Sequence, residues 1–166
     1  MAKSCPCRAR RVDADVRTGR TEGASIDPSG APRDTARQAR LSPDGRYALF
    51  RVFQPDQGGS RVALYARDLR TGAVAEVAAA GAQPAAMTAD DRWVYFAADD
   101  AAAVPGDTNG TPDVFRRELG TGRIERVAEA VAPATAPAVD ALGDTVLYGA
   151  PDGTRADVLV RYLPRP

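Results

Sequence analysis

Oxygen-bearing side chains recur in the segment from 107 to 113. Asp107, Asn109 and Asp113 stand in an alternating pattern, and Glu118 follows Asp107 by eleven residues. Carboxylate and amide oxygens at such a spacing are the ligands that a hard cation such as calcium prefers. The sequence therefore predicts a calcium site at Asp107, Asn109 and Asp113, the best metal candidate in the chain.

A turn without a metal ion explains the same segment. Pro112 occupies its sixth position, where helix-flanked calcium loops need glycine for a sharp bend. The following Val114 and Phe115 are typical of a strand, and Asp and Asn side chains also hydrogen-bond their own backbone in tight turns. An Asx-rich turn between two strands is the competing interpretation. Asp99 and Asp100 would add oxygens only if the loop folds back over the strand end.

The residues needed for common catalytic arrangements are missing from the sequence. It contains no histidine, which excludes Ser-His-Asp and Cys-His arrangements within the chain. It also has no GxSxG, P-loop or GxGxxG motif. Cys5 and Cys7 flank Pro6 without the further ligands that a zinc site requires. We therefore expect a protein that is not an enzyme and that needs no cofactor.

Charge and hydropathy exclude two further classes of partner. Lys+Arg and Asp+Glu both number 22, whereas nucleic-acid-binding proteins carry a clustered basic excess. No apolar run approaches the length of about 18 residues that spans a bilayer. We expect neither a nucleic-acid partner nor a membrane span. The basic start is not followed by the apolar stretch of a secretory signal, so the localisation stays open.

A turn that leads into an apolar strand occurs three times. It reads SPDGRYALF at 42–50, TADDRWVYF at 88–96 and, in weaker form, DALGDTVLY at 140–148, at offsets of 46 and 52. In the first copy Pro43 presets the backbone of a tight turn, Asp44 can bond its own backbone, and Gly45 supplies a positive φ. Asp91 takes the place of Gly45, so we expect it in the left-handed region, which Asp tolerates better than most residues.

A strand that ends in a hairpin is the second repeated part. It reads ALYARDLRTGAVAEVA at 63–78 and DVFRRELGTGRIERVA at 113–128, with Gly72 and Gly122 aligned. A shorter trace at 15–24 places Gly19 at the same point, and the pattern returns from Asp157 as DVLVRYLPRP. Short strands bounded by glycine turns at regular spacing predict an all-β meander.

The repeat has the size of one β-propeller blade, which holds about four short strands. Strands such as 94–97 are apolar on both faces, so they must be covered from both sides, as in stacked blades. Large aromatic side chains dominate packing between sheets. We therefore predict a core role, rather than ligand stacking, for the aromatic residues Trp93, Tyr95, Phe96, Tyr47, Phe50 and Phe53.

About three blades are predicted, in an incomplete or open propeller. We expect residues 1–11 to form a frayed or disordered terminus and residues 12–166 to hold the repeats. These divide into a partial blade to about 40, a blade at 41–86, a blade at 87–136 and a partial blade at 137–166. Propellers typically close with about four to eight blades. Open blade edges predict self-association as one way to complete the arc.

The repeat resembles that of TolB-like, WD40-like (PD40) β-propellers, through the SPDGRYALF element. PGDTNGTPDVFRRELGTG at 105–122 resembles a form common in bacterial surface and secreted proteins, and the likeness extends from about Val12 to Tyr162. The resemblance implies a noncatalytic interaction platform, usually working outside the cytoplasm, that presents loops to a protein or peptide partner. A calcium- or ligand-binding propeller and the accessory propeller of a larger peptidase-like enzyme are the alternatives.

Overall fold

Every regular element of the described chain is a β-strand. The computed structural model describes residues 13–15, 19–27, 29–56, 59–79, 82, 86–98, 111–128, 137–151 and 156–164. Thirteen strands lie in these ranges, which confirms the predicted all-β class. Within the same ranges, no helix has the length and apolar character needed to cross a lipid bilayer.

The strands form one short hairpin and three antiparallel sheets. The hairpin pairs β1 (Asp13–Asp15) with β2 (Arg20–Glu22). The first blade contains β3 (Ala36–Leu41), β4 (Tyr47–Asp56), β5 (Gly59–Asp68) and β6 (Val74–Ala78). The second blade contains β7 (Ala86–Met87), β8 (Trp93–Ala98), β9 (Asp113–Glu118) and β10 (Ile124–Ala128). The third blade contains β11 (Ala138–Val139), β12 (Thr145–Pro151) and β13 (Ala156–Tyr162).

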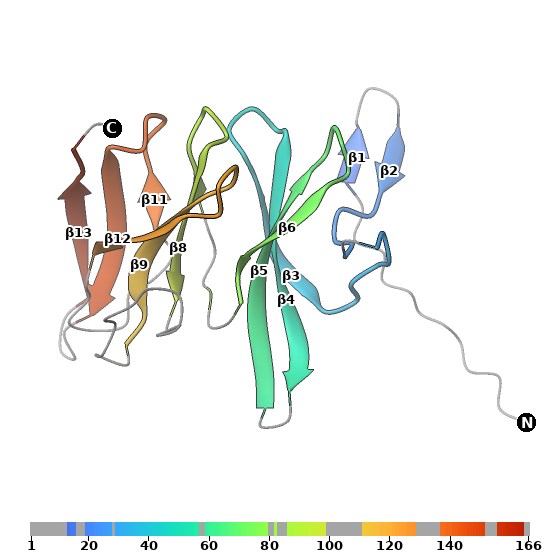
Figure 1. Ribbon diagram of the computed structural model, residues 1–166, viewed down its shortest axis with the longest axis horizontal. Helices are drawn as coiled ribbons and strands as arrows, with labels where there is room; N and C mark the ends of the chain where they lie inside the picture. The colour runs from blue at the N-terminus through green and yellow to red at the C-terminus, as the bar shows by residue number, and fades with distance from the viewer. Residues whose placement is uncertain are drawn as a thin grey trace, which may run out of the picture.

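The blades lie side by side in chain order, as Figure 1 shows, with the β1–β2 hairpin at one end of the arc and β13 at the other. In each blade the strands pair in sequence order, which is the up-and-down meander of a propeller blade. The described residues therefore confirm an open or partial propeller. The predicted blade boundaries at 41, 87 and 137 stay a prediction of the sequence.

Turn residues take the backbone conformations that the sequence predicted. Gly45 has φ of 74° and Asp91 has φ of 60°. Asp91 therefore occupies the left-handed region in the second copy of the turn, where the first copy uses glycine. In the weaker third copy Gly143 has φ of 79°, so all three turns that lead into the second strand of a blade share one backbone geometry.

Apolar side chains fill the spaces between neighbouring blades. One cluster joins Leu49 and Leu64 of the first blade to Phe96 and Phe115 of the second. A second cluster joins Tyr95 and further residues of the second blade to Val146 and Tyr148 of the third. Burying these faces is the main source of stability for stacked sheets. Of the six aromatic residues predicted to be core, Phe53 is the exception, with 37% of its surface exposed.

Arginine side chains on the third strand of a blade also connect it to the preceding part of the chain. Arg117 of β9 donates a hydrogen bond to the Val77 carbonyl in β6, at 3.1 Å. Arg67, at the equivalent position of β5, donates to the Gly23 carbonyl at 2.6 Å. Gly23 follows the β1–β2 hairpin. The same type of arginine-to-carbonyl hydrogen bond therefore joins the first two blades and holds the N-terminal segment against the first blade.

Candidate functional site

The turns that lead into β4 and β8 form a polar rim built by the same contacts. In the first turn Ser42 Oγ donates to Asp44 Oδ1 at 2.7 Å, and the Tyr47 amide donates to Ser42 Oγ at 2.9 Å. In the second, Thr88 Oγ1 donates to Asp90 Oδ1 at 2.6 Å. In each turn, a Ser or Thr hydroxyl and the aspartate two residues later thus form side-chain hydrogen bonds that stabilise the turn.

Each of these turns is also tied to the next hairpin of its own blade by an arginine–carboxylate pair. Arg46 reaches Asp68 with an Nη2–Oδ2 distance of 2.7 Å, and Arg92 reaches Glu118 with an Nε–Oε1 distance of 2.6 Å. The hydrogen bond from Arg46 lowers the pKa of Asp68 from 3.8 to about 2. The carboxylate therefore stays ionised at any ordinary pH.

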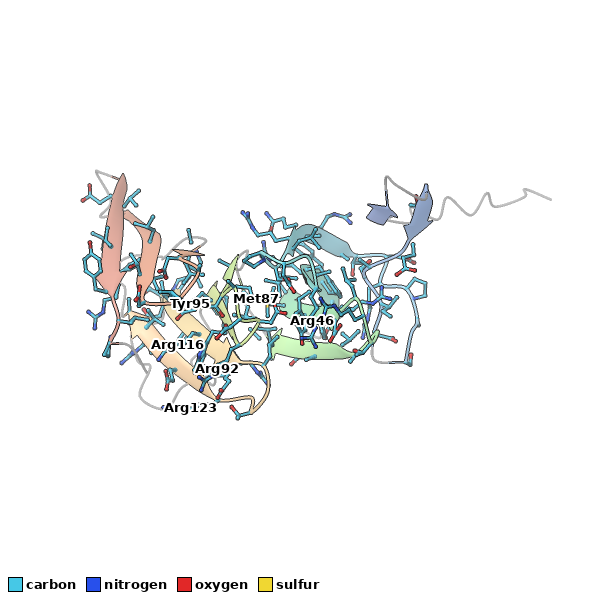
Figure 2. All side chains as sticks on the ribbon, turned by 90° about the horizontal axis from the view of Figure 1, so that it is seen from above. Arg46, Met87, Arg92, Tyr95, Arg116 and Arg123 are labelled. Atoms are coloured by element: carbon cyan, nitrogen blue, oxygen red, sulfur yellow. The ribbon has the colours of Figure 1, made fainter. Side chains whose placement is uncertain are left out.

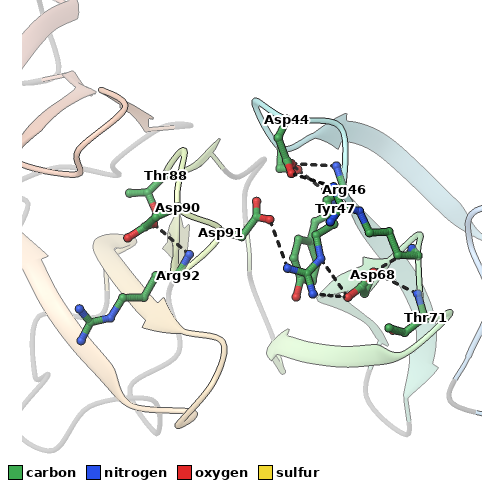
Figure 3. A network of polar contacts seen from close by, with 11 residues as sticks. Asp44, Arg46, Tyr47, Asp68, Thr71, Thr88, Asp90, Asp91 and Arg92 are labelled. Atoms are coloured by element: carbon green, nitrogen blue, oxygen red, sulfur yellow. Dashed lines mark hydrogen bonds and ion pairs between the residues drawn. The ribbon is translucent and has the colours of Figure 1, made fainter.

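Asp91 connects the polar rims of the first and second blades, as Figure 3 shows. Its Oδ2 atom lies 3.7 Å from Nη1 of Arg46. Burial and the negative charge of Asp44 raise the pKa of Asp91. Arg46 thus lies between two acidic side chains from different blades, Asp68 and Asp91. This ion pair links the first and second blades through charged side chains.

A groove of about 560 Å³ lies where the innermost strands of the three blades come together. Its lining comes from β3, β7 and β11 and the residues beside them, and includes the apolar side chains of Leu41, Met87 and Val139. Among the described lining residues, Arg40 contributes the single charged side chain. Leu41, the last residue of β3, is 61% exposed. We call this feature the axial groove.

Arg116 stands in a separate cluster on the outer part of the second blade. Its guanidinium lies 4.4 Å from the ring centroid of Trp93, and Nε donates to Glu125 Oε2 at 2.7 Å. Nη1 also donates to the hydroxyl of Tyr95 at 3.3 Å, and Figure 2 shows these two residues close together. The Tyr95 hydroxyl donates in turn to the Gly143 carbonyl of the third blade at 2.7 Å. The contacts of Arg116 are therefore structural.

Only one residue of the predicted calcium site belongs to the described chain. Asp113 begins β9, is fully buried, and pairs with Arg126 at 3.3 Å. Asp107 and Asn109 lie outside the described residues. The calcium site therefore remains a prediction from the sequence, with a basic side chain already next to one of its proposed ligands.

Two features of the site were not identified from the sequence. The pairing of Arg46 with Asp68, and of Arg92 with Glu118, had a detectable signal, because aligned repeat positions carry opposite charges in both blades. The axial groove left no recognisable signal in the sequence, since β7 and β11 are only two residues long and show no periodic pattern.

Comparisons with known proteins find likeness only among solved structures. No protein-family model matches the sequence, and no curated protein matches it. TolB from Acinetobacter baumannii superposes with a TM-score of 0.60 at 21% identity, covering 92% of this chain and 37% of TolB. The β-propeller domain of the Trilobed protease from Pyrococcus furiosus, described as having an open velcro topology, has a TM-score of 0.60 at 12% identity.

A peptidase superposes on this chain with a similar TM-score, but the match covers a smaller part of the peptidase. A puromycin-hydrolysing peptidase of Mycobacterium tuberculosis has a TM-score of 0.55 at 17% identity, covering 87% of this chain and 24% of the peptidase. The Trilobed protease domain is covered over 38% of its length and 75% of this chain. This chain thus spans less than half of the length of each of these three proteins. Its fold is that of a partial, TolB-like β-propeller.

Proposed function

We propose that the chain is a noncatalytic interaction module whose axial groove holds an extended segment of a protein or peptide partner. The observation that carries this proposal is the groove itself, which joins three blades and exposes apolar side chains such as Leu41 to solvent. Concave, mainly apolar sites with a few polar groups are the usual form of a binding site.

The strands that line the groove favour an extended ligand. β3, β7 and β11 are each the first strand of a sheet, and among the described strands each pairs with one neighbour. Strands with a free side can accept an added strand through main-chain hydrogen bonds, while pockets select alternate side chains. The inner edges of three blades therefore offer backbone donors and acceptors to a chain that runs through the groove.

Arg40 indicates the chemistry of the partner segment. It is exposed and is the single charged residue among the lining residues that the structure describes. A carboxylate near an arginine forms charge-assisted, geometrically specific hydrogen bonds. We therefore propose that the bound segment combines a large apolar side chain, placed against Leu41 and Met87, with an acidic side chain or a carboxyl terminus near Arg40.

The noncatalytic part of the proposal is supported by composition and by the contacts of the acidic residues. The chain contains no histidine. Among the described residues, Asp68, Asp91 and Glu118 are each held by an arginine of the rim. Carboxylates in such pairs serve to hold the structure together, since a catalytic carboxylate needs access to a substrate.

Selection from a phage library of random linear peptides on the immobilised chain tests this proposal. Calorimetric titration of a selected peptide is then repeated on Leu41→Asp and Arg40→Glu. We expect each substitution to weaken binding by at least about tenfold, or 1.4 kcal/mol. Leu142→Asp is the matched control, because Leu142 is 69% exposed and lies outside the groove. Peptides whose affinity depends on Leu142 and not on Leu41 would disprove the groove as the site.

A second candidate function is that of an accessory propeller within a peptidase-like assembly. The structural likeness to the puromycin-hydrolysing peptidase favours it. In this case the same groove would contact the substrate of a separate catalytic domain. A hydrolase reading frame adjoining the gene would support this candidate, and peptide binding by the isolated chain with no such frame nearby would favour the first proposal.

A further inference from the structure

Three arginines of the first blade lie on the face of its sheet that is turned toward the second blade. Directly opposite residues of an antiparallel pair carry their side chains on the same face. Arg37 of β3 is opposite Arg51 of β4, and Arg40 of β3 is opposite Leu49. Leu49 and Arg51 are two residues apart in one strand, so they also share a face. Leu49 packs against the second blade, and the three arginines therefore lie on that side.

A β-bulge in β3 brings Arg40 to this face. Residues 37 and 40 are three positions apart, so regular alternation would place them on opposite faces. The register shifts between Arg37 and Arg40, and the extra residue reverses the alternation. Gln38, within the bulge, has φ of 53°, in the left-handed region that residues other than glycine rarely occupy. Bulges often re-aim a side chain beside a functional site, where strained backbone also tends to occur.

Arg51 is buried without a carboxylate partner among the described residues. Only 9% of its surface is exposed, and its Nε has no hydrogen-bond partner. Nη1 donates to Oε1 of Gln38, and Cζ lies 5.6 Å from the ring centroid of Phe53. Burial lowers the pKa of Arg51. A buried charge without an opposite charge costs free energy, and a bound anion would offset this cost.

The segments around this face supply no acidic side chain. The sequences of β3, ARQARL, and of the connection from β6 to β7, AAGAQPA at 79–85, contain neither Asp nor Glu. Arg37 and Arg40 are exposed, and within the described chain no ion pair joins either of them to a carboxylate. Like charges on directly opposite residues, such as Arg37 and Arg51, repel each other. The positive charge of this face is therefore left without compensation from described residues.

We propose that Arg37, Arg40 and Arg51, together with Gln38, form a binding site for a multiply charged oxyanion, of the phosphate or polycarboxylate type, at the inner edge of the first blade. Guanidinium groups give charge-assisted and often bidentate hydrogen bonds to such oxygens. Ala39 and Arg40 line the axial groove, which gives the ligand room beside the bulge.

Gln38 explains how the ligand reaches Arg51. In the free chain its Oε1 holds the position of a ligand oxygen on Nη1 of Arg51. Because Gln38 is exposed and its acceptor carries no charge, an anion forms the stronger hydrogen bond and takes this position. The amide Nε2 can then donate to the same ligand. The inference goes beyond the proposed function, since it concerns a small anion and needs no peptide.

Thermal unfolding in phosphate, compared with chloride at matched ionic strength, tests the proposal. With about 10 mM phosphate and a dissociation constant of about 1 mM, the folding equilibrium constant should rise about elevenfold. The melting temperature should rise by about 3–6 °C. Arg51→Met should abolish this rise. In chloride it should melt at or above the wild-type temperature, because methionine removes an uncompensated buried charge and still fills the space of the arginine stem.

Arg70→Met is the matched control. Arg70 belongs to the same blade, but its side chain is 72% exposed and lies 3.9 Å from Asp44 of the rim. This variant also loses one positive charge and should keep the wild-type response to phosphate. It thereby separates binding at Arg51 from the general stabilisation that phosphate gives to folded proteins.

Arg37→Gln and Arg40→Gln test the site even if Arg51→Met does not fold, because both side chains are exposed. Each should weaken phosphate binding at least about threefold in a calorimetric titration, while circular dichroism shows a folded chain. The same titrations with citrate distinguish the two sources of oxyanion. Tighter binding of citrate would assign the site to polycarboxylates, and tighter binding of phosphate would assign it to phosphorylated compounds.

Two results would overturn the proposal. The first is a wild-type chain whose melting temperature rises in phosphate and citrate no more than that of Arg51→Met. The second is an Arg51→Met chain that melts well below the wild type in chloride and responds to phosphate as the wild type does, which would give Arg51 a purely structural role. No peptide is present in these measurements, so a failure of the peptide-binding proposal would leave their outcome unchanged.

Discussion

Replacing Gly143 with alanine tests how tightly the third blade is packed against the second. Gly143 lies in the turn between β11 and β12 with φ of 79°. A methyl group there would stand 2.8 Å from Cγ2 of Thr88 and 3.0 Å from the hydroxyl oxygen of Tyr95. Both neighbours belong to the second blade and are buried, so neither can move away freely.

The expected cost has two parts, and Gly45→Ala separates them. Gly45 has a similar φ of 74°, but an added methyl group would meet nothing within 4 Å. Its substitution should cost only the left-handed penalty of an L-residue, about 1–2 kcal/mol. Gly143→Ala carries the same penalty plus overpacking of about 1–3 kcal/mol. We therefore expect Gly143→Ala to lower the free energy of unfolding by about 1–3 kcal/mol more than Gly45→Ala.

Urea unfolding, followed by both far-ultraviolet circular dichroism and tryptophan fluorescence, measures this difference. Coincident transitions and an unchanged m-value would allow the two free energies to be compared. Trp93 is the only tryptophan in the chain and lies in the same cluster as Tyr95, so its fluorescence reports on the interface between blades. Equal losses in the two variants would refute the close contact of Gly143 with Thr88 and Tyr95.

Three further changes have defined outcomes. Tyr95→Phe removes the donor to the Gly143 carbonyl and should lower the free energy of unfolding by about 1–3 kcal/mol; urea stability equal to that of the wild type would contradict this. Because the Arg46 hydrogen bond lowers the pKa of Asp68 from 3.8 to about 2, the stabilisation is present above pH 3.8 and is lost as the pH falls toward 2. The urea midpoint should therefore drop more over this range in the wild type than in Asp68→Asn. For the calcium site predicted at Asp107, millimolar calcium, and not magnesium, should raise the melting temperature, and Asp107→Asn should abolish the shift; a melting temperature indifferent to calcium would favour the turn without a metal ion.

Local features of this fold were predictable because they depend on a few neighbouring residues. Positive φ at Asp91 followed from its alignment with Gly45, and the structure confirms it. Antiparallel hairpins around Gly72 and Gly122 likewise follow from turn chemistry. Trp93 and Tyr95 are buried as expected, since both faces of a strand covered by neighbouring sheets lie away from water.

Features that depend on how blades face one another could not be predicted in the same way. Phe53 belongs to the same strand as the buried Phe50, yet it is exposed. The two residues lie on opposite faces of the strand, since side chains alternate along it, and the sequence does not tell which face is covered at each end. The contact of Arg46 with Asp91 joins turns from different blades, and the repeat pattern says nothing about the distance between turns. Asp107 and Asn109 stay untested because they lie outside the described residues.

By itself the sequence determined the all-β class, the blade-sized repeat and the turn conformations, because glycine, proline and aspartate act on the backbone within a few residues. Only the tertiary structure decided that Arg46 pairs with Asp91 of the next blade, and that residues in and beside three strands, two of them very short, line a groove that includes Leu41 and Arg40. Both depend on which sheet packs against which, a property of contacts between residues that are far apart in the chain.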